Sequence, residues 1–366
     1  MTSAPRLLTL VAELTYACPL HCAYCSNPTH LASRSASLSY EDWLQVIDQA
    51  EALGALQVHF TGGEPLLYSE LERLIGRARE RDLYVNLVTS GSPLCRNRLV
   101  ELARAGLEHL QLSLQAKSQE KNIAIAGVNL LEQKLEVARW TKELGLQLTI
   151  NIVLHRENVG ELPELLALAE ALEPHRIELA NVQYLGWALK NRGRLMPSRE
   201  ELESARLLAA AAKERLKGRT DVLFVIPDYY AERPRACMGG WGQSYMVVTP
   251  DGLALPCHAA REIAGLHFED VRSAPLAAIW SEGSAFQEFR GIDWHPEPCR
   301  SCPERRKDFG GCRCQAFALT RDARATDPAC ALSPHHEVVV QARRTRAPSE
   351  ELLILRRPPS FGRGLF

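Results

Sequence analysis

Short apolar runs alternate with longer amphipathic segments over the first two-thirds of this chain. A bounded apolar run predicts a buried β-strand, whereas apolar residues that recur every three or four positions predict a helix packed on one face. On this pattern, strands are expected at residues 7–14, 56–60, 84–88, 109–114, 147–153 and 177–182. Helical segments lie between them, and the last of these spans about 198–216.

The segment after Ser39 carries the clearest helix signals. Ser39 is expected to be the N-cap, and Asp42, three residues later, completes a capping box. The helix should end near Gly54, which supplies a stop. One apolar stripe faces the sheet, and it consists of Trp43, Val46, Ile47, Ala50 and Leu53.

Strand and helix alternate about six times, which predicts an α/β fold with a parallel sheet curled into a full or partial barrel. The pattern does not distinguish six strands from eight, or a barrel from an open doubly wound sheet. In a barrel of this kind, functional residues lie at the C-terminal ends of the strands. The loops that follow the predicted strands are therefore the expected place of the functional residues.

Composition is that of an ordinary enzyme with a large core: 366 residues, 46% hydrophobic, with a formal net charge of −1. This charge gives no reason to expect nucleic acid or an anionic membrane as a partner. The early apolar run at 7–14 is too short for a signal peptide, and no run reaches transmembrane length. Eleven cysteines without a secretion signal are expected to bind metal in a reducing compartment, which predicts a cytoplasmic location.

Three of these cysteines, Cys18, Cys22 and Cys25, follow the first predicted strand with the spacing C-x3-C-x2-C. A cubane iron–sulfur cluster normally takes four thiolates, one for each iron. Three thiolates leave one iron open, and an open metal position favours chemistry over scaffolding. The alternatives are unrelated buried thiols or a zinc site, for which His21 is the nearest candidate for a fourth ligand.

This spacing, with Tyr24 before the last cysteine, resembles the signature of the radical S-adenosylmethionine (SAM) enzymes. The resemblance implies a [4Fe–4S] cluster whose open iron binds the amino and carboxylate groups of SAM. After the second strand, Gly62, Gly63, Glu64 and Pro65 resemble the family element that holds the SAM amino group, with Glu64 facing the ammonium. Ser90, Ser113 and Asn151 are further candidate SAM contacts, and ordinary capping of loops is the alternative for each.

From Cys237 the composition changes, and seven of the eleven cysteines lie between Cys237 and Cys330. Their spacing resembles the SPASM extension, which carries auxiliary clusters, with one departure: Asp308 stands where a cysteine is expected. Two clusters need about eight ligands, so Asp308 would be the eighth. The alternatives are a solvated Asp308 and, for the whole region, a zinc ribbon.

The resemblance implies two groups of ligands, on clusters of the [4Fe–4S] or [2Fe–2S] type. Auxiliary cluster I would use Cys237, Cys257, Cys312 and Cys314, and auxiliary cluster II would use Cys299, Cys302, Asp308 and Cys330. Cys95 fits neither group and is expected to be a buried thiol. We expect a radical SAM core at 1–225, a SPASM domain at 226–340 and a flexible, arginine-rich tail at 341–366.

Asp308 followed by Cys312-x-Cys314 resembles, within the SPASM enzymes, the PqqA peptide cyclases of pyrroloquinoline quinone biosynthesis. The resemblance implies a bond from a glutamate γ-carbon to a tyrosine ring carbon in the precursor peptide PqqA. A SAM-derived radical would remove hydrogen from the unactivated carbon, and the auxiliary clusters would accept an electron. The implied partners are PqqA, the peptide chaperone PqqD and a flavodoxin-like reductant. The alternatives are another SPASM enzyme, which matures sulfatases or forms thioethers, and an electron-transfer adaptor.

Overall fold

The computed structural model describes residues 5–29, 37–348 and 351–357 of the chain. Within these residues the strands are β1 (Thr9–Thr15), β2 (Gln57–Gly62), β3 (Tyr84–Thr89), β4 (His109–Ser113), β5 (Gln147–Leu154), β6 (Arg176–Asn181), β7 (Asp221–Phe224), β8 (Tyr245–Val248) and β9 (Ala254–Leu255). They form one sheet in the order β7-β6-β5-β4-β3-β2-β1-β8-β9.

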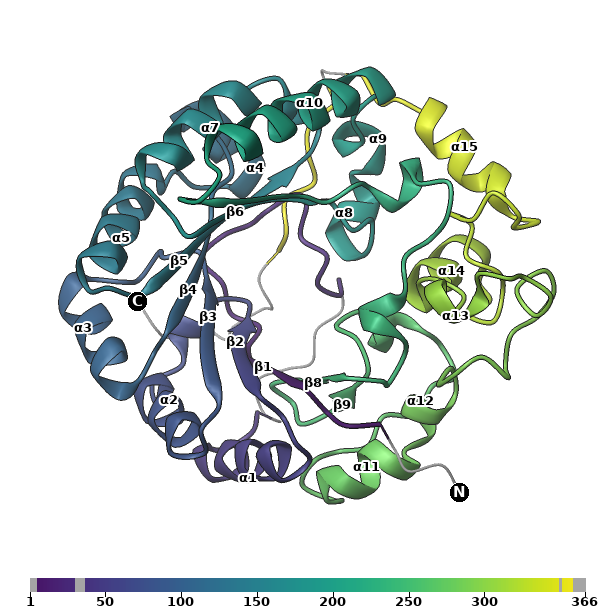
Figure 1. The fold of residues 1–366 in the computed structure, drawn as a ribbon, viewed down its shortest axis with the longest axis horizontal. Coiled ribbons are helices and arrows are strands. Elements are labelled where there is room, and N and C mark those ends of the chain that lie inside the picture. Colours follow the sequence, from purple (N-terminus) through teal and green to yellow (C-terminus); the bar gives the residue numbers. More distant parts are fainter. Residues whose placement is uncertain (1–4, 30–36, 349–350, 358–366) are drawn as a thin grey trace.

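The sheet is parallel from β7 to β8, and only β9 runs antiparallel to its neighbour β8. It curls into an open barrel with helices on its outer face (Figure 1). The predicted α/β class and partial barrel are confirmed, and all six predicted strands are present as β1 to β6. Apolar residues of these strands, such as Leu10, Phe60 and Leu110, are fully buried, whereas the residues between them in β2, β4 and β6 are only partly buried.

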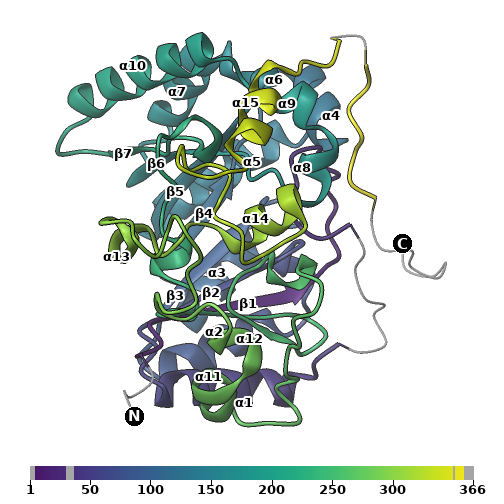
Figure 2. The ribbon, with the colours of Figure 1, turned by 90° about the vertical axis from the view of Figure 1, so that its right-hand side faces the viewer.

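The helices that follow the strands along the barrel are α1 (Tyr40–Ala52), α2 (Leu71–Glu80), α3 (Arg96–Ala105), α4 (Gln119–Ala126), α5 (Leu131–Glu143), α6 (Arg156–Val159), α7 (Leu162–Ala171), α8 (Gly186–Lys190), α9 (Arg192–Leu195) and α10 (Arg199–Arg215). The cysteine-rich region adds α11 (Leu276–Glu282), α12 (Ser284–Gln287), α13 (Arg305–Asp308), α14 (Arg313–Thr320) and α15 (His336–Arg344). Figure 2 shows α11 to α15 along one side of the barrel.

Local signals explain the ends of the best-predicted helices. The Ser39 hydroxyl accepts from the backbone N–H of Asp42, and the Asp42 carboxylate accepts from the N–H of Ser39, so the predicted capping box is present. α1 buries four residues of its predicted stripe, Leu53 is its half-buried C-cap, and Gly54 follows at a φ of 95°. α10 begins with a second capping box, between Ser198 and Glu201.

Three strands were not predicted. β7 is a four-residue edge strand, and β8 and β9 lie in the region that was expected to be separate from the barrel. β8 pairs with β1 on the side opposite to β2, with Val11 opposite Val247. Such short strands give too little periodicity to be recognised, and their partners are distant in sequence. The cysteine-rich region therefore continues the barrel's own sheet.

Two other expectations need correction. The segment 341–366 was expected to be a flexible tail, but α15 continues to Arg344, and residues 351–357 run back along α9 and α8 toward the loop after β1 (Figure 1). Residues 349–350 and 358–366 of that tail lie outside the described residues. Cys95, expected to be buried, is exposed because it occupies the N-cap of α3. Within the described part of the chain, no helix is long and apolar enough to cross a membrane.

Candidate active site

The loop that carries the first three cysteines starts at the C-terminal end of β1 and is held by neighbouring loops. The backbone N–H groups of His21 and Ala23 donate to carbonyls of α4, at 2.8 and 2.9 Å. On the other side, the Cys25 carbonyl accepts from Ala188 at 3.0 Å. The loop is therefore fixed by backbone contacts that leave the cysteine side chains free for ligands.

The glycines after β2 allow that strand's end to approach the cysteine loop. The Gly63 N–H donates to the Thr15 carbonyl at 2.5 Å, and the Glu64 N–H donates to the Ala17 carbonyl at 2.7 Å. A Cβ on Gly63 would lie 2.2 Å from the Ala17 carbonyl oxygen. A Cβ on Gly62, whose φ is 135°, would lie 2.4 Å from that of Thr15. Close contact between two backbones thus requires glycine here.

Glu64 is fully buried, and its carboxylate is directed at the end of β3. One oxygen accepts from the Thr89 hydroxyl at 2.6 Å, and the other accepts from the Ser90 N–H at 2.8 Å. The Ser90 hydroxyl and the N–H of Leu66 also donate to it. Glu64 therefore holds the ends of β2 and β3 together, and a direct contact with an ammonium stays a prediction.

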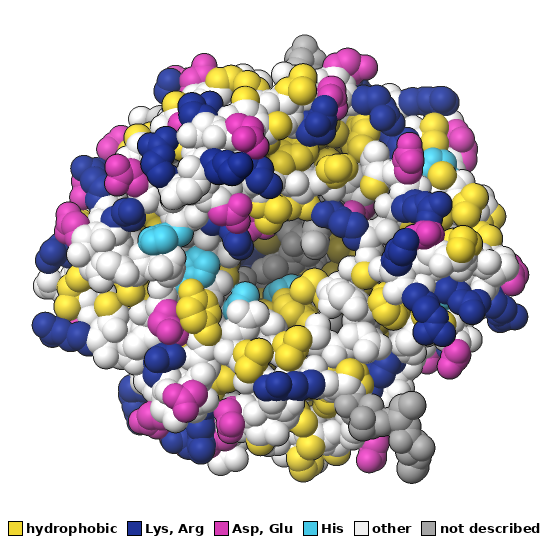
Figure 3. Space-filling view, viewed as in Figure 1, with side chains coloured by type: hydrophobic (Ala, Val, Ile, Leu, Met, Phe, Trp, Pro, Cys, Tyr) yellow, Lys and Arg dark blue, Asp and Glu magenta, His cyan; other side chains and the backbone are white. Residues whose placement is uncertain are grey.

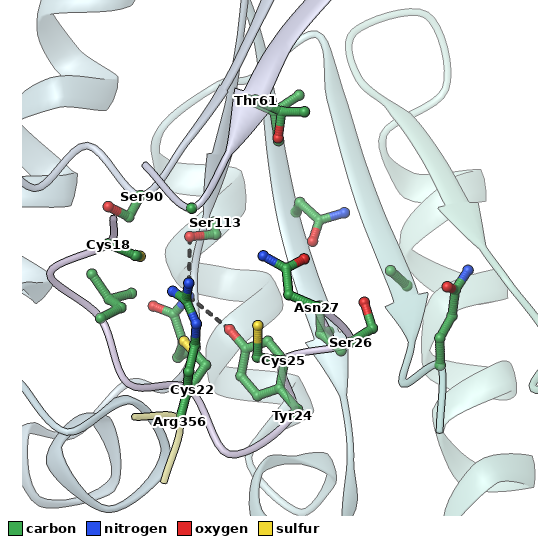
Figure 4. Close-up of a pocket in the computed structure, with 18 of the residues that line it drawn as sticks. Cys18, Cys22, Tyr24, Cys25, Ser26, Asn27, Thr61, Ser90, Ser113 and Arg356 are labelled. Carbon is green, nitrogen blue, oxygen red and sulfur yellow. Dashed lines mark hydrogen bonds between the residues drawn. The ribbon is translucent and has the colours of Figure 1, made fainter. Parts of the chain in front are cut away.

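These loops surround a cavity of about 410 Å³ at the C-terminal ends of the strands (Figure 4). Most of the residues predicted for the first site line this cavity, namely Cys18, Cys22, Cys25, Gly62, Gly63, Ser90, Ser113 and Asn151. Glu64 and Pro65 lie behind the lining, and Pro65 begins a buried 3-10 turn. Unpredicted residues on its wall include Asn27, Gln183 and Arg356.

The three thiols are chemically suited to a cationic group. Burial raises the pKa of Cys18 to about 11 and that of Cys22 to about 12, and it also raises the pKa of Cys25. Burial disfavours the negatively charged thiolate, which is the form that binds iron. The positive charge of bound iron would therefore be needed to stabilise the three thiolates in this cavity. In a cluster each thiolate binds a different iron, so the thiols need to face a common space. The cavity wall provides that arrangement.

A single metal ion makes a different demand, because its ligands must converge on one point. Among residues 5–29, 37–348 and 351–357, no three His, Cys, Asp or Glu side chains are placed to hold one ion. The cysteines are instead distributed over three groups, one at the barrel mouth and two in the cysteine-rich region.

A buried polar network fixes Tyr24 beside the cysteines. The tyrosine hydroxyl accepts from Gln115 at 2.9 Å, and the same amide donates to the Ser113 hydroxyl at 3.0 Å (Figure 4). Lys134, only 2% exposed, donates to the Ser113 carbonyl at 2.7 Å and to the Gln115 side chain. Burial lowers the pKa of Lys134 to about 8.

The four cysteines predicted for auxiliary cluster I lie against one another. Hydrogen bonds to Cys257 and Cys312 raise the pKa of the Cys237 thiol, and hydrogen bonds to the same two sulfurs raise that of Cys314. Accepting those bonds lowers the pKa of Cys257 and Cys312. The four sulfurs come from three segments, because Cys312 and Cys314 are two residues apart, and they belong to an apolar cluster that includes Trp241.

The second predicted group is more open. Asp308 ends α13 and is half-buried, and one of its carboxylate oxygens accepts from the Gly310 N–H at 3.0 Å. Burial raises the pKa of Cys299 and Cys330, and the nearby charge of Asp308 raises both further. Cys302 also acts on Cys330. The four predicted ligands of auxiliary cluster II are therefore electrostatic neighbours.

Asp327 lies between the two auxiliary groups and was not singled out from the sequence. It is 1% exposed, and burial raises its pKa to about 6. Its carboxylate accepts from the Cys312 N–H at 2.7 Å and from the Gln315 side chain at 2.8 Å. Asp327 thus braces the backbone of one auxiliary group while its charge acts on Cys330 of the other.

The opposite end of the barrel presents a different surface. A cavity of about 550 Å³ lies there among residues that begin β2 to β6, and it includes His59 and His109. Burial lowers the pKa of both imidazoles to about 4. The face drawn in Figure 3 is hollowed at its centre, with histidine side chains on the rim of the hollow. The three cysteines predicted to bind the first cluster lie at the other end of the strands.

Lys134 and Arg356 are the charged residues of the first site that sequence reasoning missed. Lys134 occupies the buried face of α5 with Val137, Ala138 and Thr141, so a lysine inside an apolar stripe was the available signal. Arg356 had no local signal, because it lies in an arginine-rich segment whose partners are more than 300 residues away.

Two family models match the chain. The model described as "Radical SAM superfamily" matches residues 12–169, which include the first three cysteines and the strands up to β5. The model described as "Iron-sulfur cluster-binding domain" matches residues 237–303, which include four of the cysteines in the second region. The first model ends before β6, and the second ends before Asp308.

Curated relatives match over nearly the whole chain. A protein of Granulibacter bethesdensis named PqqA peptide cyclase is 51% identical over 93% of this chain and 92% of its own length. A protein of the same name from Gluconobacter oxydans is 48% identical, with coverage of 98% and 99%. One from Streptomyces rochei is 50% identical, with coverage of 90% and 91%.

Solved structures share the fold at low sequence identity. Streptococcus suis SuiB bound to S-adenosylmethionine superposes with a TM-score of 0.73 at 19% identity, covering 90% of this chain and 78% of SuiB. The enzyme anSMEcpe with bound AdoMet gives a TM-score of 0.65 at 16% identity, covering 93% and 96%. At these identities the likeness shows a common fold, in which the barrel and the cysteine-rich region are both included.

Proposed function

Because the chain belongs to the PqqA peptide cyclase family of radical SAM enzymes, we propose that it joins a glutamate γ-carbon to a tyrosine ring carbon within the PqqA peptide. The observation that carries this proposal is the cavity whose wall contains three cysteines, the two glycines after β2 and the polar ends of β3 to β5. In this proposal the cluster and SAM bind at the wall that carries the cysteines and glycines, and the peptide binds at the mouth of the cavity.

In this proposal Cys18, Cys22 and Cys25 hold the [4Fe–4S] cluster, and Gly62, Gly63, Ser90, Ser113 and Asn151 contact SAM. When bound, the cluster and SAM supply a radical that can take hydrogen from an unactivated carbon. Glu64 holds Ser90 in place, and Gln115, which follows β4, holds Tyr24 of the cysteine loop. The buried wall keeps water away from the reacting carbons, which protects a radical from side reactions.

The reacting residues of the peptide are proposed to lie between this cavity and the auxiliary thiols. A second cavity, of about 200 Å³, shares residues 180–183 with the first, and its wall includes Cys312. A radical added to a tyrosine ring must lose one electron and one proton to restore aromaticity. Auxiliary clusters on Cys237, Cys257, Cys312 and Cys314, and on Cys299, Cys302, Asp308 and Cys330, are the proposed acceptors of that electron.

A peptide substrate is supported by a structural neighbour. The structure of SuiB bound to its precursor peptide SuiA superposes with a TM-score of 0.73 and covers 90% of this chain. We further propose a PqqD chaperone and a flavodoxin-like reductant as partners. The cytoplasm is the proposed compartment, because eleven free thiols require reducing conditions.

The test is anaerobic turnover with synthetic PqqA, SAM and dithionite. The expected products are 5′-deoxyadenosine and a peptide that lacks two hydrogen atoms, with fragmentation mapping the new bond to a glutamate and a tyrosine. Replacing Cys18, Cys22 and Cys25 by alanine should abolish both products while auxiliary iron stays bound. SAM cleavage by the triple variant would refute the site, and a thioether or unmodified peptide would refute the crosslink.

A further inference from the structure

Residues 351–357 form a strap that lies across the back of the cysteine loop. Asn191 joins the two segments, because its side-chain amide donates to the carbonyls of Ala23 and Ile354, both at 2.8 Å. Its side-chain oxygen accepts from the Ile354 N–H at 2.8 Å. One buried asparagine thus holds the strap and the cysteine loop together.

The strap's contact with the loop continues at Arg356. Its N–H donates to the His21 carbonyl at 3.0 Å, and its own carbonyl lies 3.0 Å from His21 Nδ1. Its guanidinium Nη2 donates to the Tyr16 carbonyl at 2.6 Å. These three contacts fix both the backbone and the side chain of Arg356 against the loop that begins at the end of β1.

The Arg356 guanidinium is directed into the cavity among the three cysteines (Figure 4). The residue is 3% exposed, and its Nε has no hydrogen-bond partner within the described part of the chain. Burying a cation with an unsatisfied N–H is costly unless a negative group compensates it. The position therefore indicates an anionic occupant of the cavity next to Cys18 and Cys25.

We propose that Arg356 supplies a fixed positive charge to the N-terminal iron–sulfur cluster and thereby favours its one-electron reduction. This inference rests on the proposed function, in which Cys18, Cys22 and Cys25 bind that cluster. A [4Fe–4S]²⁺ core with three thiolates carries one net negative charge, and an electron from an external reductant makes it two. A buried cation stabilises the more negative state more strongly, which raises the reduction potential.

Two other charged residues lie near the cavity, and one of them, Lys134, also acts electrostatically on Cys22 and Cys18. Lys134 is held by Ser113 and Gln115, on the side of the cavity that faces α5. Glu64 is satisfied by uncharged donors, so its negative charge opposes reduction of a nearby cluster. Arg356 is thus the cation that the strap brings to the cysteine loop from a distant part of the chain.

The test is a redox titration of the reconstituted holoenzyme without SAM, followed by electron paramagnetic resonance. The triple Cys18, Cys22 and Cys25 alanine variant identifies which signals belong to the auxiliary clusters. Arg356→Gln should lower the ratio of reduced to oxidised N-terminal cluster roughly tenfold at fixed potential, a shift of about 59 mV for one electron. Arg356→Lys should stay near the wild type, as should Arg357→Gln, which alters the exposed neighbour.

Each other outcome decides the proposal. An unchanged reduction potential of the N-terminal cluster in Arg356→Gln overturns the proposal. If this variant also binds SAM more weakly at that unchanged potential, the guanidinium contacts the SAM carboxylate instead. If Arg356→Gln fails to bind the N-terminal cluster, Arg356→Lys decides the matter. A wild-type reduction potential in Arg356→Lys supports the proposed role of the positive charge, and loss of the cluster in Arg356→Lys overturns it. If the signal assigned to the N-terminal cluster persists in the triple cysteine variant, the proposed function is refuted instead, because that signal would then come from another cluster.

Discussion

Glu64 and Ser90 join the ends of two neighbouring strands, because both the N–H and the hydroxyl of Ser90 donate to the same carboxylate oxygen of Glu64. Glu64 itself follows the glycines that pack on the cysteine loop. The carboxylate of Glu64 thus joins the ends of β2 and β3, and the backbone N–H of the same residue donates to the cysteine loop at Ala17. The Glu64 carboxylate accepts hydrogen bonds from uncharged donors, so a neutral replacement should first disturb the geometry of these strand ends.

Glu64→Gln should therefore weaken both the fold and SAM binding. An amide offers one acceptor oxygen, so its NH2 group must face either Ser90 or the donors Thr89 and Leu66. Leaving a buried donor unsatisfied costs about 1–3 kcal/mol, and a similar loss in ligand affinity is roughly tenfold or more in Kd. Calorimetric titration of SAM and denaturant unfolding measure the two effects.

The matched control is Glu101→Gln, which alters an exposed glutamate on α3. It should leave SAM affinity and the free energy of unfolding at wild-type values. Wild-type SAM affinity in Glu64→Gln would show that Glu64 is an ordinary loop residue.

Gly63→Ala should separate the loop after β2 from the cysteine loop. The new methyl group would lie 2.2 Å from the Ala17 carbonyl oxygen, so one of the two backbones must move. Overpacking of this kind typically costs about 1–3 kcal/mol. Gly160→Ala is the control, because a Cβ there meets nothing within 4 Å. If the two variants had equal free energies of unfolding, the close approach of the Gly63 and Ala17 backbones would not be the reason for a glycine at position 63.

The sequence was sufficient for the parts of the fold whose signals are local. The capping box of Ser39 and Asp42, the apolar runs of β1 to β6 and the cysteine spacings each lie within a short window. Each of the six predicted strands is found where the pattern placed it, apart from shifts of one or two residues at its ends.

The parts that were missed depend on contacts between distant segments. β8 is a four-residue strand whose place is set by pairing with β1, and no window of sequence contains both. Arg356 meets the cysteine loop 335 residues from its own position, at His21. Glu64 was predicted to face the SAM ammonium, but the sequence could not show that its carboxylate accepts hydrogen bonds from Thr89 and Ser90 at the end of β3.

Lys134→Met should change how stability depends on pH in the iron-free protein. Burial lowers the pKa of Lys134 from 10.5 to about 8. Between these values the unfolded state binds more protons than the folded state, so the free energy of unfolding rises with pH. The variant should lack about 1–2 kcal/mol of that rise between about pH 7.5 and 9.5.

Denaturant unfolding at several pH values gives the difference between wild type and variant, which cancels contributions from other groups. Lys213→Met, on the exposed face of α10, should keep the wild-type slope. A Lys134→Met protein with the wild-type slope would mean that this ammonium remains charged throughout the range.

Variants of Asp308 test whether auxiliary cluster II has an oxygen ligand. Asp308→Ala should remove iron from that group, because Cys299, Cys302 and Cys330 alone supply three ligands. Iron content should fall by up to one cluster, and the N-terminal cluster should still cleave SAM. Asp293→Ala, which alters an exposed aspartate in the same region, should leave iron content unchanged.

Asp308→Cys tests the same ligand without emptying the site. A thiolate delocalises charge onto the cluster better than a carboxylate does, so iron and SAM cleavage should be kept while the electron paramagnetic resonance signal changes and peptide crosslinking slows. Asp308 is half-buried at the end of α13 and is followed by Phe309, Gly310 and Gly311, so a shorter cysteine side chain there starts from the same backbone position. If Asp308→Ala and Asp308→Cys both kept wild-type iron, spectra and crosslinking rate, Asp308 would be a solvated residue. Its hydrogen bond to Gly310 would then be its whole role.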